Sequence, residues 1–195
     1  MPIYTLDDDK QARGLRRKSV RVTNFQDPSI IMLRQQMDLI CRQTGVAGIA
    51  ANQLGSKARV FALTQGPEKE AMFFFNPILK GVSAEEKSDS EGCLSVPGRS
   101  GYVIRAIQVK LRWQDENGSK FNNRGERYES SFDGFWARAV QHELDHLDGF
   151  VYTDKCAETF SQEEMEAKFY AAKSAESDHE VTVADKIVLV ANDEA

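Results

Sequence analysis

The sequence contains only three cysteines and five prolines in 195 residues, and it has no long apolar run. Because the cysteines are odd in number and far apart, no disulfide framework is expected and a reducing compartment fits. No segment reaches the roughly 20 apolar residues that a membrane-spanning helix needs. The first ten residues carry three consecutive acids and no apolar stretch, which argues against a secretory signal or a transit peptide. We therefore expect a bacterial cytoplasmic protein with no membrane partner.

Basic residues are outnumbered by acidic ones, and the formal net charge is -5. Proteins that recognise a specific nucleic acid usually carry a basic footprint, so no specific nucleic-acid partner is predicted. One basic cluster lies near the N-terminus, and two interpretations of it remain open. It is either an ordinary solvated surface or a docking patch for an RNA-rich partner such as the ribosome. The cluster comprises Lys10, Arg13, Arg16, Arg17, Lys18 and Arg21.

The order of the predicted elements is typical of an α+β fold rather than of repeated βαβ units. A first helix is expected over residues 28–44, because Asp27 is a good N-cap, Pro28 is favoured at the first helical position and Gly45 suits the end. Its apolar residues fall on one face, which makes Cys41 a core residue. Residues 1–26 are expected to be irregular.

The middle of the chain predicts strands, and the remainder predicts two more helices. Strands are expected over 59–63, 72–75, 94–96, 102–104 and 107–113, with a hairpin-type turn over 115–118. A second long helix should span 134–147, and a third should run from Ser161 to about residue 175, with Ser161 and Glu164 as a capping box. A final strand is expected over 180–190. The expected fold is α+β, with antiparallel or mixed sheets around a central helix and with N-terminal and C-terminal helices.

The second long helix carries the pattern His-Glu-x-x-His over residues 142–146. Positions i and i+4 share one face of a helix, so His142 and His146 can both bind one metal ion. Glu143 lies beside them and is placed to accept a proton from an attacking water molecule. The chain has only three histidines, and two of them stand in this pattern, which favours a functional metal site over coincidence.

Two histidines leave the third ligand open. A zincin-type metallopeptidase would supply it after the helix, but His179 is the only later histidine. Upstream, Cys93 offers a thiolate, and a Cys-His-His set would leave a fourth tetrahedral position open, as catalysis requires. Glu91 and Asp145 are either carboxylates that orient the ligands or ordinary ion-pair partners.

Three segments together resemble the three motifs of peptide deformylases. They are Val-Ala-Gly-Ile-Ala-Ala-Asn-Gln at 46–53, Glu-Gly-Cys-Leu-Ser at 91–95 and Gln-His-Glu-Leu-Asp-His-Leu-Asp-Gly at 141–149. Their order and spacing also match, and the resemblance covers roughly residues 10–155. It implies a metal-dependent hydrolase that removes the N-terminal formyl group from formyl-methionyl nascent polypeptides and releases formate. Residues 1–155 would form the catalytic domain, and 156–195 a C-terminal helix and tail packed on it or on a partner subunit.

The resemblance also implies a metal and catalytic roles. Cys93, His142 and His146 would bind one divalent ion, which is ferrous iron in many members, although zinc, nickel and cobalt can occupy the site. Glu143 would move the proton, while the Gln53 amide and the Leu94 backbone N–H would stabilise the oxyanion.

Substrate contacts are implied for Gly48, Ala47, Val46 and Arg99. The family usually has a glycine and an apolar residue where Val46 and Ala47 stand. Many members carry a basic residue at the position of Ser100, whereas Arg99 lies one place earlier; Arg105 does match the family pattern. These departures concern substrate binding and leave the metal ligands intact.

Two alternatives are kept: a zincin-type metallopeptidase, and a non-catalytic deformylase-like domain that binds formylated termini or merely holds a structural metal. Structural zinc sites are normally closed by four protein ligands, so three ligands favour catalysis. Besides the formyl-methionyl substrate, a transient ribosome contact and a homo-oligomer are considered. The third helix is rich in glutamate, which opposes contact with RNA phosphate, so any ribosome contact is expected at the segment 10–21.

Overall fold

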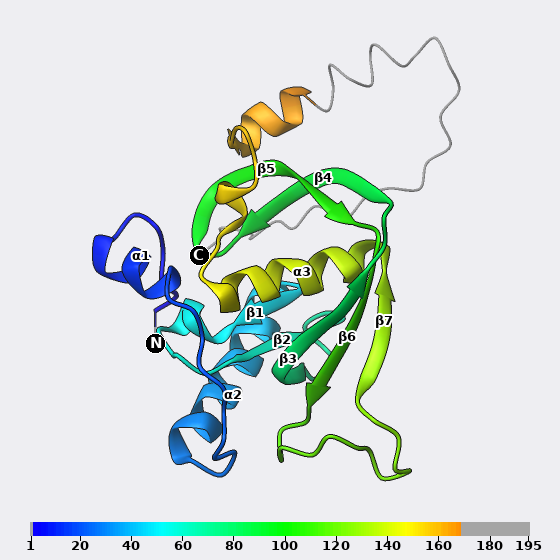
Figure 1. Cartoon of the computed structure of the whole chain (residues 1–195). Coiled ribbons are helices and arrows are strands. Elements are labelled where there is room, and N and C mark those ends of the chain that lie inside the picture. The colour runs from blue at the N-terminus through cyan, green and yellow to red at the C-terminus, as the bar shows by residue number, and fades with distance from the viewer. Residues whose placement is uncertain (1, 169–195) are drawn as a thin grey trace.

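Helix α3, residues Gly134–Asp148, lies between two sheets in the computed structural model, which describes residues 2–168 (Figure 1). All neighbouring strands in both sheets are antiparallel. The five-stranded sheet has the order β1-β2-β3-β6-β7, formed by Gly48–Ala50, Val60–Leu63, Met72–Val82, Gln108–Gln114 and Glu129–Asp133. The three-stranded sheet has the order β4-β5-β8, formed by Glu86–Cys93, Val96–Ala106 and Phe160–Ser161. The expected α+β fold around a central helix is confirmed.

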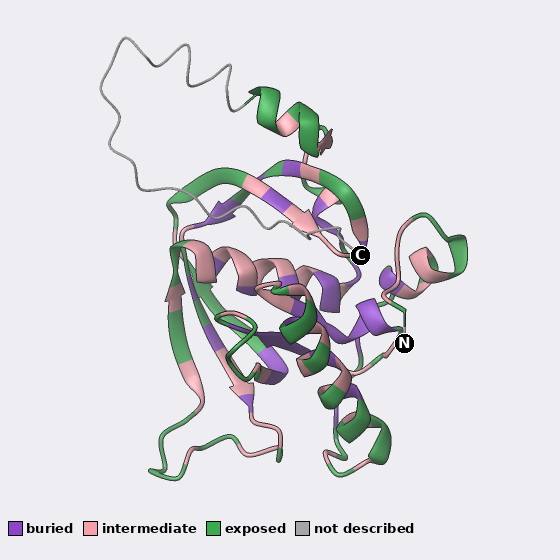
Figure 2. Ribbon diagram, turned by 180° about the vertical axis from the view of Figure 1, so that it is seen from behind, coloured by how far each residue is buried: buried purple, intermediate pink, exposed green. Residues whose placement is uncertain are grey.

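The two faces of α3 differ, and this difference places the histidines. An apolar stripe packs against the five-stranded sheet and contains Ala137, Val140, Leu144 and Leu147. Their partners include Phe61, Phe74 and Leu111, which form the buried band of that sheet (Figure 2). The other face carries the two histidines toward the end of β4. Burying the stripe therefore fixes the direction in which the histidines point.

Helix α2, Pro28–Thr44, is confirmed with its predicted ends. The Asp27 carboxylate accepts the backbone N–H of Ser29 at 2.9 Å, and Gly45 ends the helix with a φ of 67°. That left-handed conformation is one that glycine adopts without steric cost. Cys41 is fully buried in the cluster beneath the helix, as predicted.

The prediction that residues 1–26 are irregular is wrong, because α1 spans Asp9–Leu15. Asp8 caps it by accepting the backbone N–H of Gln11, and Leu15 is its single buried residue. The helix packs on the 3-10 turn η1, Ala51–Leu54. A helix with one buried side chain has no apolar periodicity, so the sequence pattern did not reveal it.

The strand predicted over 94–96 is also wrong. Leu94 and Ser95 form a two-residue turn between β4 and β5, with Cys93 paired to Val96. Strand β4 was not predicted, because six of its eight residues are polar or charged and it shows no apolar alternation. The other predicted strands coincide with parts of β2, β3, β5 and β6, although those over 59–63 and 107–113 begin one residue too early. The turn at 115–118 is closed by the Gly118 N–H, which donates to the Asp115 carbonyl.

The predicted capping box at the start of the third helix is confirmed. The Ser161 backbone N–H donates to the Glu164 carboxylate at 2.7 Å, and the Glu164 N–H donates to the Ser161 hydroxyl at 3.2 Å. Helical residues follow from 162 to 168. The rest of the predicted helix and the strand predicted over 180–190 lie outside the described residues. Within 2–168, no helix is long and apolar enough to span a membrane.

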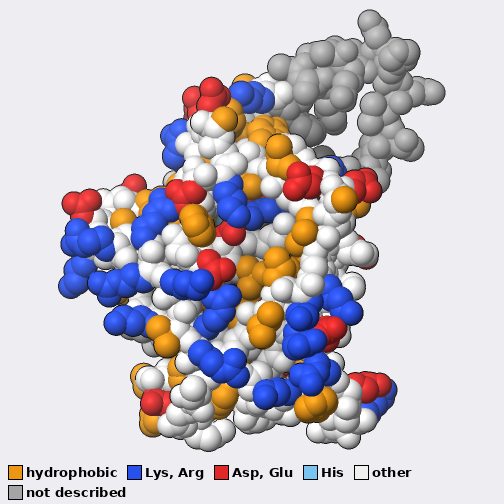
Figure 3. All heavy atoms as spheres, in the orientation of Figure 1, with side chains coloured by type: hydrophobic (Ala, Val, Ile, Leu, Met, Phe, Trp, Pro, Cys, Tyr) orange, Lys and Arg blue, Asp and Glu red, His pale blue; other side chains and the backbone are white. Residues whose placement is uncertain are grey.

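Lys and Arg side chains gather on the side of the molecule where α1 lies (Figure 3). Two of the basic residues in segment 10–21 pair with acids near the end of α3. Arg16 pairs with Asp154, and Lys18 lies 3.6 Å from the Asp148 carboxylate. The basic cluster is therefore divided into paired and unpaired cations.

Candidate metal centre

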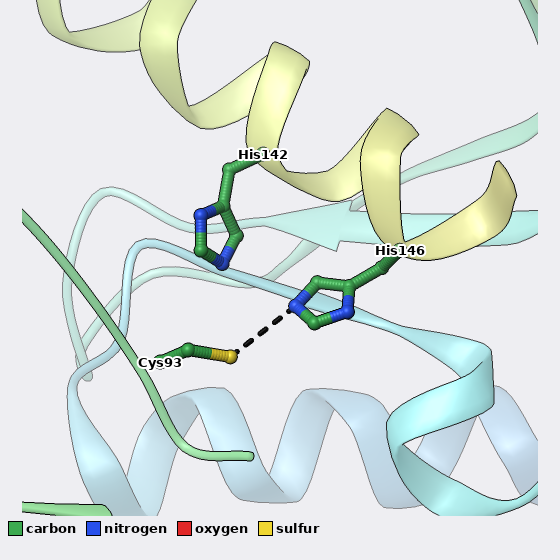
Figure 4. Close-up of side chains that lie close together, drawn as sticks. All are labelled: Cys93, His142 and His146. Carbon is green, nitrogen blue, oxygen red and sulfur yellow. Dashed lines mark hydrogen bonds between the residues drawn. The ribbon is translucent and has the colours of Figure 1, made fainter. Parts of the chain in front are cut away.

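Cys93, His142 and His146 come together between α3 and the end of β4 (Figure 4). One ligand atom from each residue lies within 4.8 Å of the other two, and Cys93 Sγ is 3.2 Å from His146 Nε2. Burial by itself raises the pKa of the Cys93 thiol, but the adjacent His146 and His142 outweigh it and hold that pKa well below its usual value. The site therefore favours the thiolate, which is the form that binds metals.

Glu91 fixes the orientation of His142. The Glu91 Oε2 atom lies 2.9 Å from His142 Nδ1, which leaves Nε2 to face Cys93 and His146. Arg105 donates two hydrogen bonds to the same carboxylate, each 2.9 Å long, and pairs with Asp145. Burial tends to raise the pKa of Glu91, but Arg105 and His142 keep it below its ordinary value. Glu91 thus orients a ligand, whereas Asp145 acts through Arg105.

Arg138 also binds Glu91, and the sequence analysis missed it. Its Nη1 atom donates to Glu91 Oε1 at 2.7 Å and to the Val103 carbonyl at 2.8 Å. Arg138 stands four residues before His142, so both lie on one face of α3 and reach the same carboxylate. The sequence shows this i, i+4 spacing but does not show that the two residues share the Glu91 carboxylate.

Glu143 is 4% exposed, and its carboxylate lies against Gly48 of β1. Burial raises the pKa of Glu143 to about 7, although the neighbouring His142 and His146 lower it. Among the described residues, its buried Oε2 atom has no hydrogen-bond partner. A water molecule in the site would supply one, so the carboxylate is placed to act on water.

Gln53 reaches the same centre from η1, where it is 2% exposed. Its Oε1 atom accepts the Ala50 backbone N–H at 2.8 Å, which turns the amide nitrogen toward Cys93 Sγ at 3.4 Å and Ser95 Oγ at 3.2 Å. Leu94 lies in the two-residue turn that follows Cys93. Gln53 and Leu94 are thus both brought close to the cysteine.

The predicted substrate-contacting residues lie at two places. Ala47 and Gly48 belong to the edge of the five-stranded sheet, where β1 has β2 on one side only. Val46 packs against the cluster beneath α2. On β5, Arg99 donates to the Thr159 hydroxyl and carbonyl, both at 2.7 Å, next to the pairing of β5 with β8.

The donor set fits a divalent metal ion. One thiolate and two imidazoles at these separations match a tetrahedral ion with bonds of about 2.0–2.3 Å. His142 has the outer hydrogen bond to a carboxylate that metal-binding histidines usually make. Among the described residues the cluster holds three donors, which leaves one tetrahedral position for water or substrate.

Comparison with known proteins gives consistent matches. A family model described as polypeptide deformylase matches residues 1–162. A peptide deformylase of Natranaerobius thermophilus is 36% identical over 150 residues, covering 77% of this chain and 90% of that protein. Peptide deformylase 1 of Bacillus subtilis is 35% identical over 144 residues, covering 74% and 84%. A class I type b peptide deformylase structure from Acinetobacter baumannii, 31% identical, has a TM-score of 0.67 and covers 80% of this chain and 97% of that one.

Proposed function

The chain belongs to the polypeptide deformylase family, and we propose that it carries out the family's reaction at Cys93, His142, His146 and Glu143. The enzyme removes the formyl group from the N-terminus of nascent peptides. The observation that carries the site assignment is the buried Glu143 carboxylate beside three converging metal donors. The matching family is polypeptide deformylase and not a zincin-type peptidase, which was one of the alternatives.

Cys93, His142 and His146 would hold one divalent ion, and ferrous iron is proposed as its identity. When bound, the ion supplies Lewis acidity, polarising the formyl carbonyl and lowering the pKa of water to about 7. The thiolate suits iron and zinc, and imidazole suits iron, zinc and nickel, so the ligand set alone admits several metals. Metal analysis of enzyme purified without oxygen tests the choice of iron.

Glu143 is the proposed proton carrier. With a pKa of about 7, its carboxylate can take the proton from the attacking water near neutral pH. It then delivers that proton to the amine that leaves as the C–N bond breaks, so that formate and a free N-terminus result. Because burial keeps Glu143 apart from bulk water, the proton passes between water and amine within the site.

Gln53 and Leu94 are the proposed oxyanion donors. The Ala50 N–H holds the Gln53 carbonyl oxygen, so the amide nitrogen is aimed at the centre before substrate arrives. Donors fixed in advance in this way are worth about 3–4 kcal/mol each in acyl transfer. The Leu94 backbone N–H would be the second donor.

The substrate peptide is proposed to lie along the free edge of β1. The backbone of Val46, Ala47 and Gly48 would pair with it as an added strand. Because the Val46 side chain packs against the core beneath α2, it does not obstruct the proposed path of the substrate. Arg99 is proposed to contact the substrate from β5.

Several further proposals concern the setting of the enzyme. Residues 1–155 are proposed as the catalytic domain and 156–195 as a tail that packs on it or on a second subunit; the pairing of β8 with β5 supports packing on the same chain. A bacterial cytoplasmic location is proposed, in line with bacterial relatives. A transient ribosome contact is proposed at the basic segment 10–21.

Formate release from a formyl-methionyl peptide tests the function directly. The metal-loaded enzyme should release formate stoichiometrically with free amine. Glu143→Gln keeps the size of the side chain but cannot carry the proton, so its turnover should fall by about 10²–10⁴-fold. Its metal content should equal that of the wild type; a loss of metal with turnover would mean that Glu143 is a ligand, not the proton carrier.

A further inference from the structure

Four basic side chains that have no ion pair among the described residues line one hollow beside α1. The hollow has a volume of about 340 Å³ and is formed by Tyr4, Lys10, Arg13, Gly14, Arg17, Gly55, Ser56 and Lys57. No acidic residue lines it, although the chain as a whole has a net charge of -5. Asp7, Asp8 and Asp9 directly precede Lys10 at the N-terminal end of α1, where Asp8 caps the helix, but none of the three lines the hollow. The hollow is therefore a local concentration of positive charge.

The walls of the hollow are held in place by contacts within the fold. The ring of Tyr4 lies where side chains at Gly14 and Gly55 would be, since a Cβ at either position would come within 2.8 Å of it. The Tyr4 N–H donates to the Gln53 carbonyl at 2.7 Å. The buried Asn52 amide donates to the Leu15 carbonyl at 3.0 Å and thereby joins η1 to the end of α1.

Lys57 comes from the loop before β2, and its position relative to α1 is also fixed. The Val20 N–H donates to the Lys57 carbonyl at 2.7 Å, and the Arg59 N–H donates to the Val20 carbonyl at 2.8 Å. The four cations thus converge from two segments that are tied together. The remaining cations of segment 10–21 differ, because Arg16 and Lys18 pair with acids and Arg21 donates to Gln114.

We infer that this hollow binds phosphates of an RNA backbone, without reading the base sequence. Arginine forks match phosphate oxygens, and lysines add point charges, so two of each suit a phosphodiester chain. The choice of RNA as the source of phosphate rests on the proposed function, because a nascent peptide is presented by an RNA-rich particle. Figure 3 shows that the surrounding face is also rich in Lys and Arg, which would extend the contact along a strand.

The test uses the full chain, a fluorescein-labelled oligouridylate and fluorescence anisotropy over a range of salt concentrations. The hollow variant is K10Q/R13Q/R17Q/K57Q. The control is K69Q/K80Q/K120Q/R124Q, which removes four exposed positive charges outside the hollow. If four phosphates are contacted, the plot of log affinity against log salt has a slope of about −3, so a fourfold rise in salt weakens binding about 50-fold. The hollow variant should lose most of this slope, and the control variant should keep it.

Three results would overturn the inference: no RNA binding by the wild type, equal loss in both variants, or tighter binding to anionic lipid vesicles than to RNA. Formate release from a short formyl peptide should be unchanged in both variants, since the four cations do not belong to the catalytic centre. Unchanged formate release also shows that the hollow variant is folded. Failure of RNA binding with formate release intact contradicts only this inference, whereas absent formate release in the wild type contradicts the proposed function.

Discussion

The carboxylate of Glu143 occupies the space that a side chain at Gly48 would need. A Cβ at position 48 would lie 2.7 Å from Glu143 Oε1 and 2.9 Å from Leu63 Cδ2. The backbone of Gly48 does not require glycine, because its φ is not in the left-handed region. The resemblance of the sequence to deformylases implies a substrate contact at Gly48, which is one reason for a residue without a side chain. The structure adds a second reason, which is the position of the proposed proton carrier.

We predict that Gly48→Ala lowers kcat for formate release by about 100-fold, because a displacement of about 1 Å at a reacting group can have that effect. Metal content should stay at the wild-type level, since the three atoms nearest to the new methyl group belong to Glu143 and Leu63 and not to a metal donor. Gly81→Ala is the matched control, as a Cβ there meets nothing within 4 Å. A kcat equal to that of the wild type would show that Glu143 tolerates displacement or has another role.

Substitutions of the three cysteines should differ in their effect on metal affinity. Cys93→Ser removes the thiolate donor, and we expect metal affinity to fall by more than about 100-fold, measured by competition with a chelator. Cys156→Ser changes a partly buried thiol outside the donor cluster and should leave metal affinity unchanged. Equal metal loading in Cys93→Ser and wild type would remove the basis of the site assignment.

Cys41→Ser should lower the melting temperature and leave metal affinity unchanged. The side chain is fully buried, and a hydroxyl there costs about 1–3 kcal/mol if it lacks a partner. Burial also raises the pKa of the Cys41 thiol to about 12, so at pH 8 this cysteine is protonated and should resist thiol reagents in the folded protein. Rapid labelling of Cys41 at pH 8 without loss of structure would contradict its burial.

The elements that could be predicted from the sequence are those whose first and last residues have strong capping preferences or whose residues have a characteristic spacing. Asp27, Pro28 and Gly45 fixed the ends of α2, and the i, i+4 histidines on an amphipathic helix predicted the centre of the fold. Strand β4 was missed, because its inward side chain Glu91 is charged and is stabilised by Arg105 and His142 rather than by apolar packing. Such a strand is recognised only when its partners, which are distant in sequence, are known.

The same limit applies to the site. The convergence of the proposed metal donors was predictable, since the residue types and spacing of such donors are restricted by coordination chemistry. Arg138 was not, because an arginine on a helix is usually solvated, and its role depends on where β4 brings Glu91. The contact between Gly48 and Glu143 likewise depends on how closely β1 and α3 pack, and this distance cannot be predicted from a local sequence pattern.

Arg138 should therefore affect the metal without being a ligand. We predict that Arg138→Ala lowers metal affinity by about 10–100-fold, because it removes one of the two hydrogen bonds to Glu91 Oε1, and this carboxylate orients His142. Arg138→Lys should recover part of the loss. Arg112→Ala is the control, since Arg112 donates to Glu129 at the surface of the five-stranded sheet. Identical metal affinities for Arg138→Ala and Arg112→Ala would mean that Arg105 alone holds Glu91.

The last prediction concerns Arg99, whose guanidinium is bonded to Thr159 in the segment that enters β8. Arg99→Ala should lower the melting temperature by about 2–4 °C, since about 1 kcal/mol is lost with these exposed hydrogen bonds. It should also raise KM about tenfold with kcat unchanged, because the proposed charge-assisted contact to the substrate would be lost equally in the ground and transition states.

Thr159→Val separates these two effects, because it removes only the hydroxyl acceptor and keeps the positive charge. Its melting temperature should fall by less than that of Arg99→Ala, and its KM should stay close to that of the wild type. If KM is unchanged in both variants, Arg99 only attaches β8 to β5. If KM rises equally in both, the position of residues 159–161, and not the guanidinium, contributes to substrate binding.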